Sequence, residues 1–125
     1  MKIERIFLFL GSLSGLLAVA AGAFGAHALR QRLPSDMLSI FETGARYQMY
    51  HALALLAVAL AASIRESPAI HLAGWCFVAG TVLFSGSLYL LAFTETRIIG
   101  AITPLGGIAF LLGWLSLAWT AWRQV

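Results

Sequence analysis

The stretch IFLFLGSLSGLLAVAAGAFGAHAL, residues 6–29, contains no Asp, Glu, Lys or Arg. A membrane-spanning helix needs about 20 apolar residues, because the hydrocarbon layer is roughly 30 Å thick and each helical residue rises about 1.5 Å. Three more stretches approach this length with almost no charge, at residues 45–64, 69–93 and 98–122. The sequence therefore predicts an all-α integral membrane four-helix bundle, in which residues 1–125 form a single four-span transmembrane domain.

The composition of the chain excludes several other classes of protein. Of the 125 residues, 61% are hydrophobic and only 10% are charged. Soluble domains contain about 25% charged residues on average, so the composition excludes a soluble globular domain. The net charge is +3 without any basic block, so we expect no nucleic-acid partner. The single cysteine, Cys76, allows neither an internal disulfide framework nor a CxxC metal site. The composition therefore indicates an integral membrane protein, whose partner is the lipid bilayer.

The first apolar stretch also has features of a cleaved signal peptide. Lys2 and Arg5 form a basic start, and Ala-Val-Ala at residues 18–20 resembles a small-residue cleavage site. The apolar run continues beyond this point to Leu29, which is longer than the core of a usual signal peptide. We therefore expect the first span to be retained.

The connections between the expected spans determine their directions. Residues 65–68 and 94–97 are too short to hold a domain, so consecutive spans run antiparallel, up and down. The connection before the second span is longer, and its residues 36–46 form an amphipathic segment that we expect to continue into that span. Both termini and the 65–68 loop share one surface, here called the terminal side. Residues 30–46 and 94–97 share the opposite surface, the distal side.

Small residues recur along one face of the first and last spans. They are Gly11, Gly15, Ala18, Gly22 and Gly25 in the first span, and Gly106, Ala109 and Gly113 in the last. Lipid tails are as apolar as leucine, so membrane helices associate through close packing, which small residues permit. Since a glycine inside a helix costs up to about 1 kcal/mol against alanine, we interpret these stripes as helix-packing faces. A substrate path along the glycines is the alternative.

Polar residues from all four spans are predicted to converge near the distal side. Up-and-down connectivity puts the ends of the first and third spans beside the starts of the second and fourth. All three tyrosines then lie toward the distal side and all four tryptophans toward the terminal side, as residues that favour membrane interfaces would. We expect a polar binding pocket in the distal leaflet, built from His27, Tyr47, Gln48, His51, Ser85, Tyr89 and Thr103.

Four motifs follow one another along the chain and cover nearly its whole length. They are GAFGAHAL at 22–29, ETG at 42–44 with YQMYHAL at 47–53, FSGSLY at 84–89, and TPLGG at 103–107. Together they resemble the family called domain of unknown function 423, the transmembrane protein 256 homologues. The resemblance implies a small multi-span protein of the bacterial inner membrane, and it implies no particular activity.

Two histidines suggest a cofactor site. Neutral imidazoles ligate haem iron, copper or zinc, and His27 and His51 are predicted on facing helices in one leaflet. A metal site normally needs three or four ligands, however, and His71 and Cys76 lie toward the opposite surface. We therefore expect no metal and no cofactor, and a bis-histidine cofactor site stays as an alternative.

The residues of a catalytic site are missing from the expected spans. The sequence has no Gly-x-Ser-x-Gly elbow and no aspartate inside a span. Ser85 or Ser87 paired with His51 would lack a third, orienting group. No Asp, Glu, Lys or Arg stands at mid-depth, where proton-coupled or cation-coupled carriers need an ionisable residue. The sequence thus favours a protein that is neither an enzyme nor an ion-coupled carrier.

These observations favour an accessory or scaffold subunit that packs through its small-residue helix faces. We expect it to form a homo-oligomer or to belong to a larger membrane complex. A passive conduit, or a small-molecule or anion binding site in the distal leaflet, is the alternative, since hydroxyls and amides suffice for such solutes. The expected location is the cell inner (plasma) membrane, which the chain crosses several times.

The orientation in the membrane depends on the basic residues, because cytoplasmic loops carry an excess of Lys and Arg. The two sides tie, with Lys2, Arg5, Arg65 and Arg123 on the terminal side and Arg30, Arg32, Arg46 and Arg97 on the distal side. The first helix usually dominates in such a case, which favours cytoplasmic N- and C-termini. The tie also permits insertion in both orientations, with an antiparallel dimer.

Overall fold

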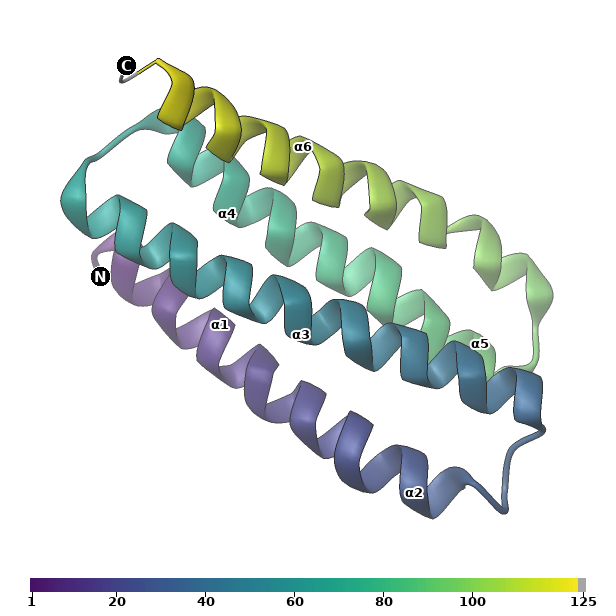
Figure 1. The fold of residues 1–125 in the computed structure, drawn as a ribbon. Coiled ribbons are helices and arrows are strands. Elements are labelled where there is room, and N and C mark those ends of the chain that lie inside the picture. The colour runs from purple at the N-terminus through teal and green to yellow at the C-terminus, as the bar shows by residue number, and fades with distance from the viewer. Residues whose placement is uncertain (124–125) are drawn as a thin grey trace.

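A computed structural model describes residues 1–123 of the chain, which is helical apart from short connections (Figure 1). Four helical segments are long and apolar enough to cross a membrane: Ile3–Leu29, Ser35–Ile64, Pro68–Thr94 and Arg97–Trp122. The part of the chain described contains no strand. The prediction of an all-α, four-helix membrane bundle is confirmed.

Each segment is built from one to three helical elements. The first consists of α1 (Ile3–Val19), η1 (Ala20–Gly25) and α2 (Ala26–Leu29), and the second is α3 (Ser35–Ile64). The third consists of α4 (Pro68–Gly80), η2 (Thr81–Ser85) and α5 (Gly86–Thr94), and the fourth of η3 (Arg97–Ala101) and α6 (Thr103–Trp122). η1 and η2 are π-helical and η3 is a 3-10 helix. Because π-helical hydrogen bonds span one residue more than α-helical ones, η1 and η2 rotate the faces of the helices that follow them.

Local chemistry explains where the third segment begins and ends. Ser67 caps α4, since its Oγ accepts a hydrogen bond from the backbone N–H of Ala69 at 3.3 Å. Pro68 follows at the start of the helix, where the missing N–H of proline costs nothing. Glu95 adopts a left-handed conformation, with φ of 53°, which stops α5. The chain therefore reverses within a few residues at both ends of this segment.

The second segment starts well before its charge-free run. α3 begins at Ser35, directly after Pro34, so the amphipathic residues 36–46 are continuous with the spanning part, as the sequence predicted. α3 has 30 residues in all. His51 consequently lies near the middle of this helix and not near its distal end.

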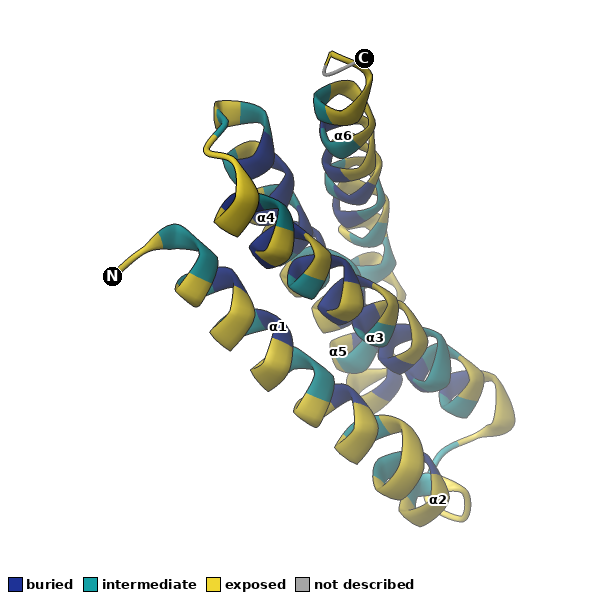
Figure 2. Ribbon diagram, turned by 60° about the vertical axis from the view of Figure 1, so that its left-hand side comes forward, coloured by how far each residue is buried: buried dark blue, intermediate teal, exposed yellow. Residues whose placement is uncertain are grey.

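The helices pack in the order in which they occur along the chain. α1 lies along α3, α3 lies against α4 and α5, and α4 with η2 lies against α6. Figures 1 and 2 show α1 and α6 at the two outer edges of this arrangement, with the start of α1 and the end of α6 at the same end of the molecule. In the apolar part of α3, 44% of the residues are buried, against 17% in the first and the fourth segments. α3 is therefore the helix on which the others assemble.

The small residues of the first segment face α3. A Cβ on Gly11 would lie only 3.0 Å from the carbonyl oxygen of Ala52, so glycine favours this close approach of the two helices. The other positions follow the same line, with Gly15 near Ala52, Gly22 near Ala45, Gly25 against Phe41, and Ala18 buried. This stripe lies between the first two spans of the same chain.

The small residues of the last segment face the third. A Cβ on Gly106 would collide with the backbone of Phe84 in η2, and one on Gly113 would lie 2.6 Å from the ring of Phe77 in α4. Ala109, between these two glycines, is half-buried. The glycine face of α6 thus lies directly on α4 and the π-helical η2.

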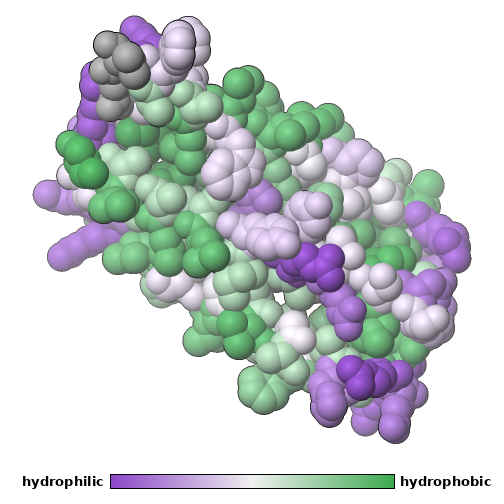
Figure 3. All heavy atoms as spheres, in the orientation of Figure 1, coloured by the Kyte–Doolittle hydropathy of each residue, from purple (hydrophilic) through white to green (hydrophobic). Residues whose placement is uncertain are grey.

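The largest buried side chains gather toward the terminal side, where α1, α3 and α4 meet: Phe7, Leu55, Val58, Ile70 and Phe77. Many leucines on the outer faces of α1 and α6 are exposed, where lipid tails would cover them. Figure 3 shows hydrophobic residues over much of one face, with hydrophilic residues at both ends and a smaller hydrophilic patch near the middle. This distribution suits a molecule that lies across a bilayer.

Candidate functional site

Gln48 occupies the centre of a polar network that joins three spans. Its side-chain nitrogen donates to the backbone carbonyl of Ser14 in α1 at 3.0 Å, and its Oε1 accepts from the hydroxyl of Tyr89 in α5 at 2.5 Å. Gln48 itself is only 7% exposed. Because lipid offers no hydrogen bonds, a buried amide is stable there only with such partners. Gln48 therefore ties α1, α3 and α5 together.

A second hydrogen bond joins α3 to the third span close to the first. The hydroxyl of Ser85, which is 1% exposed, donates to the carbonyl oxygen of Gly44 at 2.7 Å. A Cβ on Gly44 would lie 3.0 Å from the ring of Tyr89, so a larger residue would require that ring to shift. Sequence reasoning did not single out Gly44, although its place in the ETG motif at 42–44 marked it.

Hydroxyl groups join the third span to the fourth. The Oγ of Ser87 and the Oγ1 of Thr103 lie 2.6 Å apart. Ser87 gives its own hydrogen to the carbonyl of Phe84 at 2.9 Å, so Thr103 is the donor between the two hydroxyls. Nearer the terminal side, Ser116 donates to the carbonyl of Ala69 at 2.7 Å. Hydrogen bonds thus hold α6 to the third span near both of its ends.

His51 is buried, and both of its ring nitrogens have partners. Nδ1 lies 2.8 Å from the carbonyl oxygen of Tyr47, and Nε2 lies 3.1 Å from the indole nitrogen of Trp114 in α6. A carbonyl oxygen only accepts and an indole N–H only donates, so the proton is on Nδ1 and Nε2 accepts from Trp114. The ring of Phe110 stacks on the imidazole, with 3.5 Å between the ring centroids. This is the geometry of a neutral imidazole used as a structural connector.

The structure keeps His27 and the Tyr47 ring out of this network. His27 is exposed at the end of α2, where it lines an open cavity of about 580 Å³ with residues of the 28–32 turn. The ring of Tyr47 packs against those of Tyr50 and Phe84, with centroids 5.5 and 4.8 Å away. Of the seven residues predicted to share a pocket, Gln48 and Tyr89 bond to each other. His51, Ser85 and Thr103 bond to other partners on neighbouring helices or on their own.

The two histidines do not form a bis-histidine site. Ala26, the neighbour of His27, packs with Phe41, which lies about 15 Å from His51 along the axis of α3. Both nitrogens of His51 are already bonded, so the imidazole has no lone pair left for a metal. Among residues 1–123, no group of three His, Cys, Asp or Glu side chains is placed to hold a metal ion.

The serines that a nucleophilic mechanism would need are bonded elsewhere. Ser85 donates to the backbone of α3, and Ser87 donates to the carbonyl of Phe84. Over the residues that the structure describes, no hydrogen bond links either serine to His51. The network therefore positions no nucleophile beside a base.

A cavity of about 210 Å³ adjoins the network between the first three spans. Ser14, Gln48 and Thr81 line it together with leucine and valine side chains. The hydroxyl of Ser14 is buried and has no hydrogen-bond partner in the described residues. At this cavity the network therefore borders on space that a small molecule or an acyl chain could fill.

Sequence reasoning missed Trp114 and Ser14. It placed Trp114 among the interfacial tryptophans of the terminal side, yet the indole of this residue reaches His51 in the middle of α3. The available signal was the indole N–H itself, because lipid tails offer no acceptor and this donor must therefore find one within the protein. Ser14 contributes its backbone carbonyl, which no sequence pattern marks.

The fold and the network define a multi-span integral membrane protein whose interior polar groups bond mainly to one another and to the backbone. The chain belongs to the family described as Protein of unknown function (DUF423), whose model matches residues 21–107. The family resemblance that the four motifs suggested is confirmed.

Several bacterial relatives match most of the chain. The UPF0382 membrane protein YwdK of Bacillus subtilis is 49% identical over 114 residues, which cover 90% of this chain and 93% of the relative. A UPF0382 membrane protein of Haemophilus influenzae is 47% identical over 118 residues, or 94% of each chain. One from Staphylococcus haemolyticus is 43% identical over 121 residues, or 97% and 98%. No solved structure matches this chain.

Proposed function

We propose that this chain is a non-enzymatic accessory or scaffold subunit of a homo-oligomer or of a larger membrane complex. The observation that carries the proposal is the polar network, in which the buried amide, imidazole and hydroxyl groups bond to one another or to the backbone. Groups used in this way keep helices at a fixed spacing. In the described residues they leave no acid, base or nucleophile aimed at a substrate.

The helix faces that could contact a partner are those that do not pack against another helix of the same chain. The small-residue faces lie inside the chain, where Gly11 contacts α3 and Gly113 contacts α4. The outer faces of α1 and α6 carry large apolar side chains instead, such as Leu16, 65% exposed, and Leu115, 66% exposed. A second copy or another subunit would replace lipid on one of these faces.

Site-specific photo-crosslinking in native membranes tests the scaffold proposal. A photoreactive residue at Leu16 or Leu115 samples an outer face, and one at the buried Leu55 is the matched control. We expect Leu16 or Leu115 to give an adduct with a second copy or another protein, identified by mass spectrometry, and Leu55 to give none. Adducts with lipid alone at both outer positions would contradict the proposal.

A passive conduit or small-molecule binding site is the second candidate, and the cavity beside Gln48 favours it. Its walls are apolar apart from Ser14, Gln48 and Thr81, which suits a neutral solute with one polar end. Leu13→Trp would fill this cavity from its rim without removing a hydrogen bond of the network. If this variant copies the phenotype of a deletion strain while its photo-crosslinks stay unchanged, binding is the role. An unaffected phenotype would favour the scaffold.

A further inference from the structure

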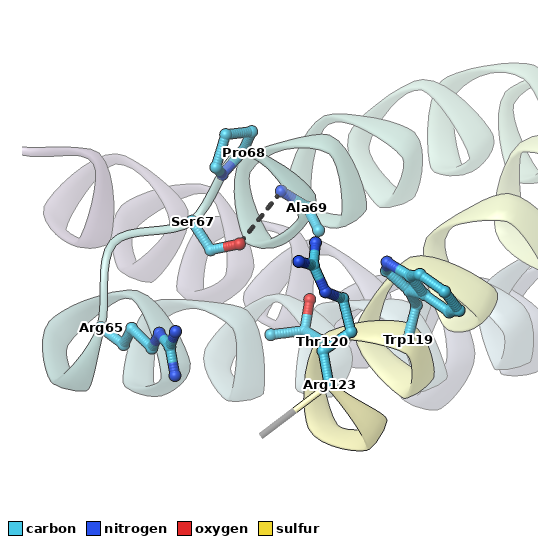
Figure 4. Close-up of a pocket in the computed structure, with 7 residues that line it drawn as sticks. All are labelled: Arg65, Ser67, Pro68, Ala69, Trp119, Thr120 and Arg123. Carbon is cyan, nitrogen blue, oxygen red and sulfur yellow. Dashed lines mark hydrogen bonds between the residues drawn. The ribbon is translucent and has the colours of Figure 1, made fainter. Parts of the chain in front are cut away.

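A cavity of about 330 Å³ opens on the terminal side, between the loop after α3 and the end of α6 (Figure 4). Two arginines from separate elements line it, Arg65 just after α3 and Arg123 just after α6. Ser67, Trp119 and Thr120 contribute polar and aromatic walls. The cavity thus brings together two positive charges that are far apart in the sequence.

Neither arginine has a carboxylate partner within residues 1–123. The ion pair found there joins Arg97 to Asp36 on the distal side. Glu66 follows Arg65 in the chain, but it is exposed and does not line the cavity. Both arginines are exposed and line the cavity, so an anion held there would face positive charge from two separate elements.

The position of Arg123 suits an anion at this cavity. The central carbon of its guanidinium lies 6.0 Å from the ring centroid of Trp119, which is within reach of a cation–π contact. In Figure 4 the side chain extends from the end of α6 toward the start of α4, where Ser67 caps the helix. The N-terminal end of a helix carries a partial positive charge, which adds to the field of the two arginines.

The cavity also lies where the headgroups of a bilayer would be. Trp119 and Trp122 are exposed at the end of the fourth span, and tryptophan favours the interface between membrane and water. A guanidinium presents a planar fork of N–H donors that matches two phosphate oxygens at once. The volume of the cavity is at the lower end of the range for small-molecule pockets, about 300–1,000 Å³.

We propose that Arg65 and Arg123 together bind a phosphate group at this cavity, supplied by an anionic phospholipid or by a soluble phosphate ester. Each guanidinium donates to phosphate oxygens, and Trp119 forms the wall beside them. Because the two arginines follow different spans, the bound phosphate ties the loop after α3 to the end of α6. This site is independent of the polar network and of the scaffold role.

Native mass spectrometry of the full chain in detergent tests the proposal. The probes are dioleoyl phosphatidylglycerol, dioleoyl phosphatidylcholine with the same acyl chains, and glycerol 3-phosphate as the soluble ester. We expect R65Q/R123Q to weaken binding of the preferred phosphate probe by roughly tenfold, because two charge-assisted contacts are lost. K2Q/R5Q is the matched control, since it removes the same charge from the same side without touching the cavity.

The possible outcomes distinguish a lipid site, a site for a soluble phosphate ester, and binding that depends on net charge alone. Tight binding of phosphatidylglycerol that R65Q/R123Q loses and K2Q/R5Q keeps assigns a lipid site. The same pattern for glycerol 3-phosphate assigns a soluble ester. Equal affinity in the two double variants, for every probe, would overturn the proposal, because binding would then depend on net charge alone. Thermal unfolding confirms that the variants fold, and the single variant R123Q replaces R65Q/R123Q if the latter does not.

Discussion

At the scale of single residues, a few hydrogen bonds determine which faces of the helices meet. Gln48, His51 and Ser85 each bond to a neighbouring span, and each would be unstable in lipid without that partner. Such interhelical bonds contribute only about 0.6 kcal/mol on average in a membrane protein. These bonds therefore contribute little to the stability of the bundle, and their main effect is to favour one arrangement of the helices over others.

Replacement of Gln48 should weaken the bundle more than replacement of its partner. Gln48→Ala removes two interhelical bonds and leaves the hydroxyl of the half-buried Tyr89 without an acceptor, so we expect a loss of about 2 kcal/mol in the free energy of unfolding. Tyr89→Phe removes only one bond and should cost about 1 kcal/mol or less. Detergent-induced unfolding in bicelles measures both. Equal stability of the two variants would show that Gln48 does not connect all three spans.

The Trp114–His51 pair makes a prediction about the histidine tautomer. In ¹⁵N NMR of histidine-labelled protein, we expect a protonated Nδ1 and an unprotonated Nε2 at His51. Trp114→Phe removes the donor to Nε2 and should shift that resonance, with a loss of about 1 kcal/mol in stability. Trp119→Phe, at the terminal side, is the control and should leave the resonance in place. A protonated Nε2 in the unaltered chain would contradict the pairing.

At the scale of the helical elements, glycines set how closely the spans approach. α6 contacts η2 and α4 through Gly106 and Gly113, and α1 contacts α3 through Gly11. No strong hydrophobic effect drives helices together inside lipid, so this close contact is the main source of their association. The π-helical η2 contributes by presenting its backbone, at Phe84, to the glycine face of α6.

Two adjacent glycines in α6 should respond to alanine in opposite ways. Gly106→Ala puts a methyl group into the backbone of Phe84, so we expect a loss of several kcal/mol or failure to fold. Gly107→Ala meets nothing within 4 Å and should be neutral or stabilising by up to about 1 kcal/mol, because alanine is the better helix former. Thermal unfolding in detergent compares the pair. Similar losses for both would mean that helix propensity, and not contact with η2, decides the effect.

At the scale of the whole molecule, the helices form an antiparallel array, with the start of α1 and the end of α6 at the same end. The two ends of this array carry equal numbers of basic residues. Neither end is therefore marked as cytoplasmic by the usual excess of Lys and Arg in cytoplasmic loops.

Reporter fusions test the orientation that we propose. Fusions at the N-terminus and after Val125 should both report the cytoplasm, because the first helix usually dominates when loop charges tie. A fusion after Arg32, between the first two spans, should report the opposite compartment and serves as the control. A signal from both compartments at any single position would instead demonstrate insertion in two orientations.

The spans and the long second helix could be predicted because charge and hydropathy act locally along the chain. The candidate site could be predicted only in part. Gln48, Ser85, Tyr89 and Thr103 were all assigned to the distal half of neighbouring spans, and Gln48 and Tyr89 bond to each other. The partner of His51 could not be predicted, because it depends on how α6 packs against α3.

Composition and run length by themselves determined that this chain has four helices long and apolar enough to cross a bilayer, because transfer into lipid depends on how many consecutive residues lack charge. Only the tertiary structure decided which polar atoms meet. Trp114 and His51 are 63 positions apart, and their contact depends on how α6 is rotated and shifted against α3. Rotation and shift follow from glycine contacts and π-helical turns that act between spans, and no local pattern in the sequence specifies them.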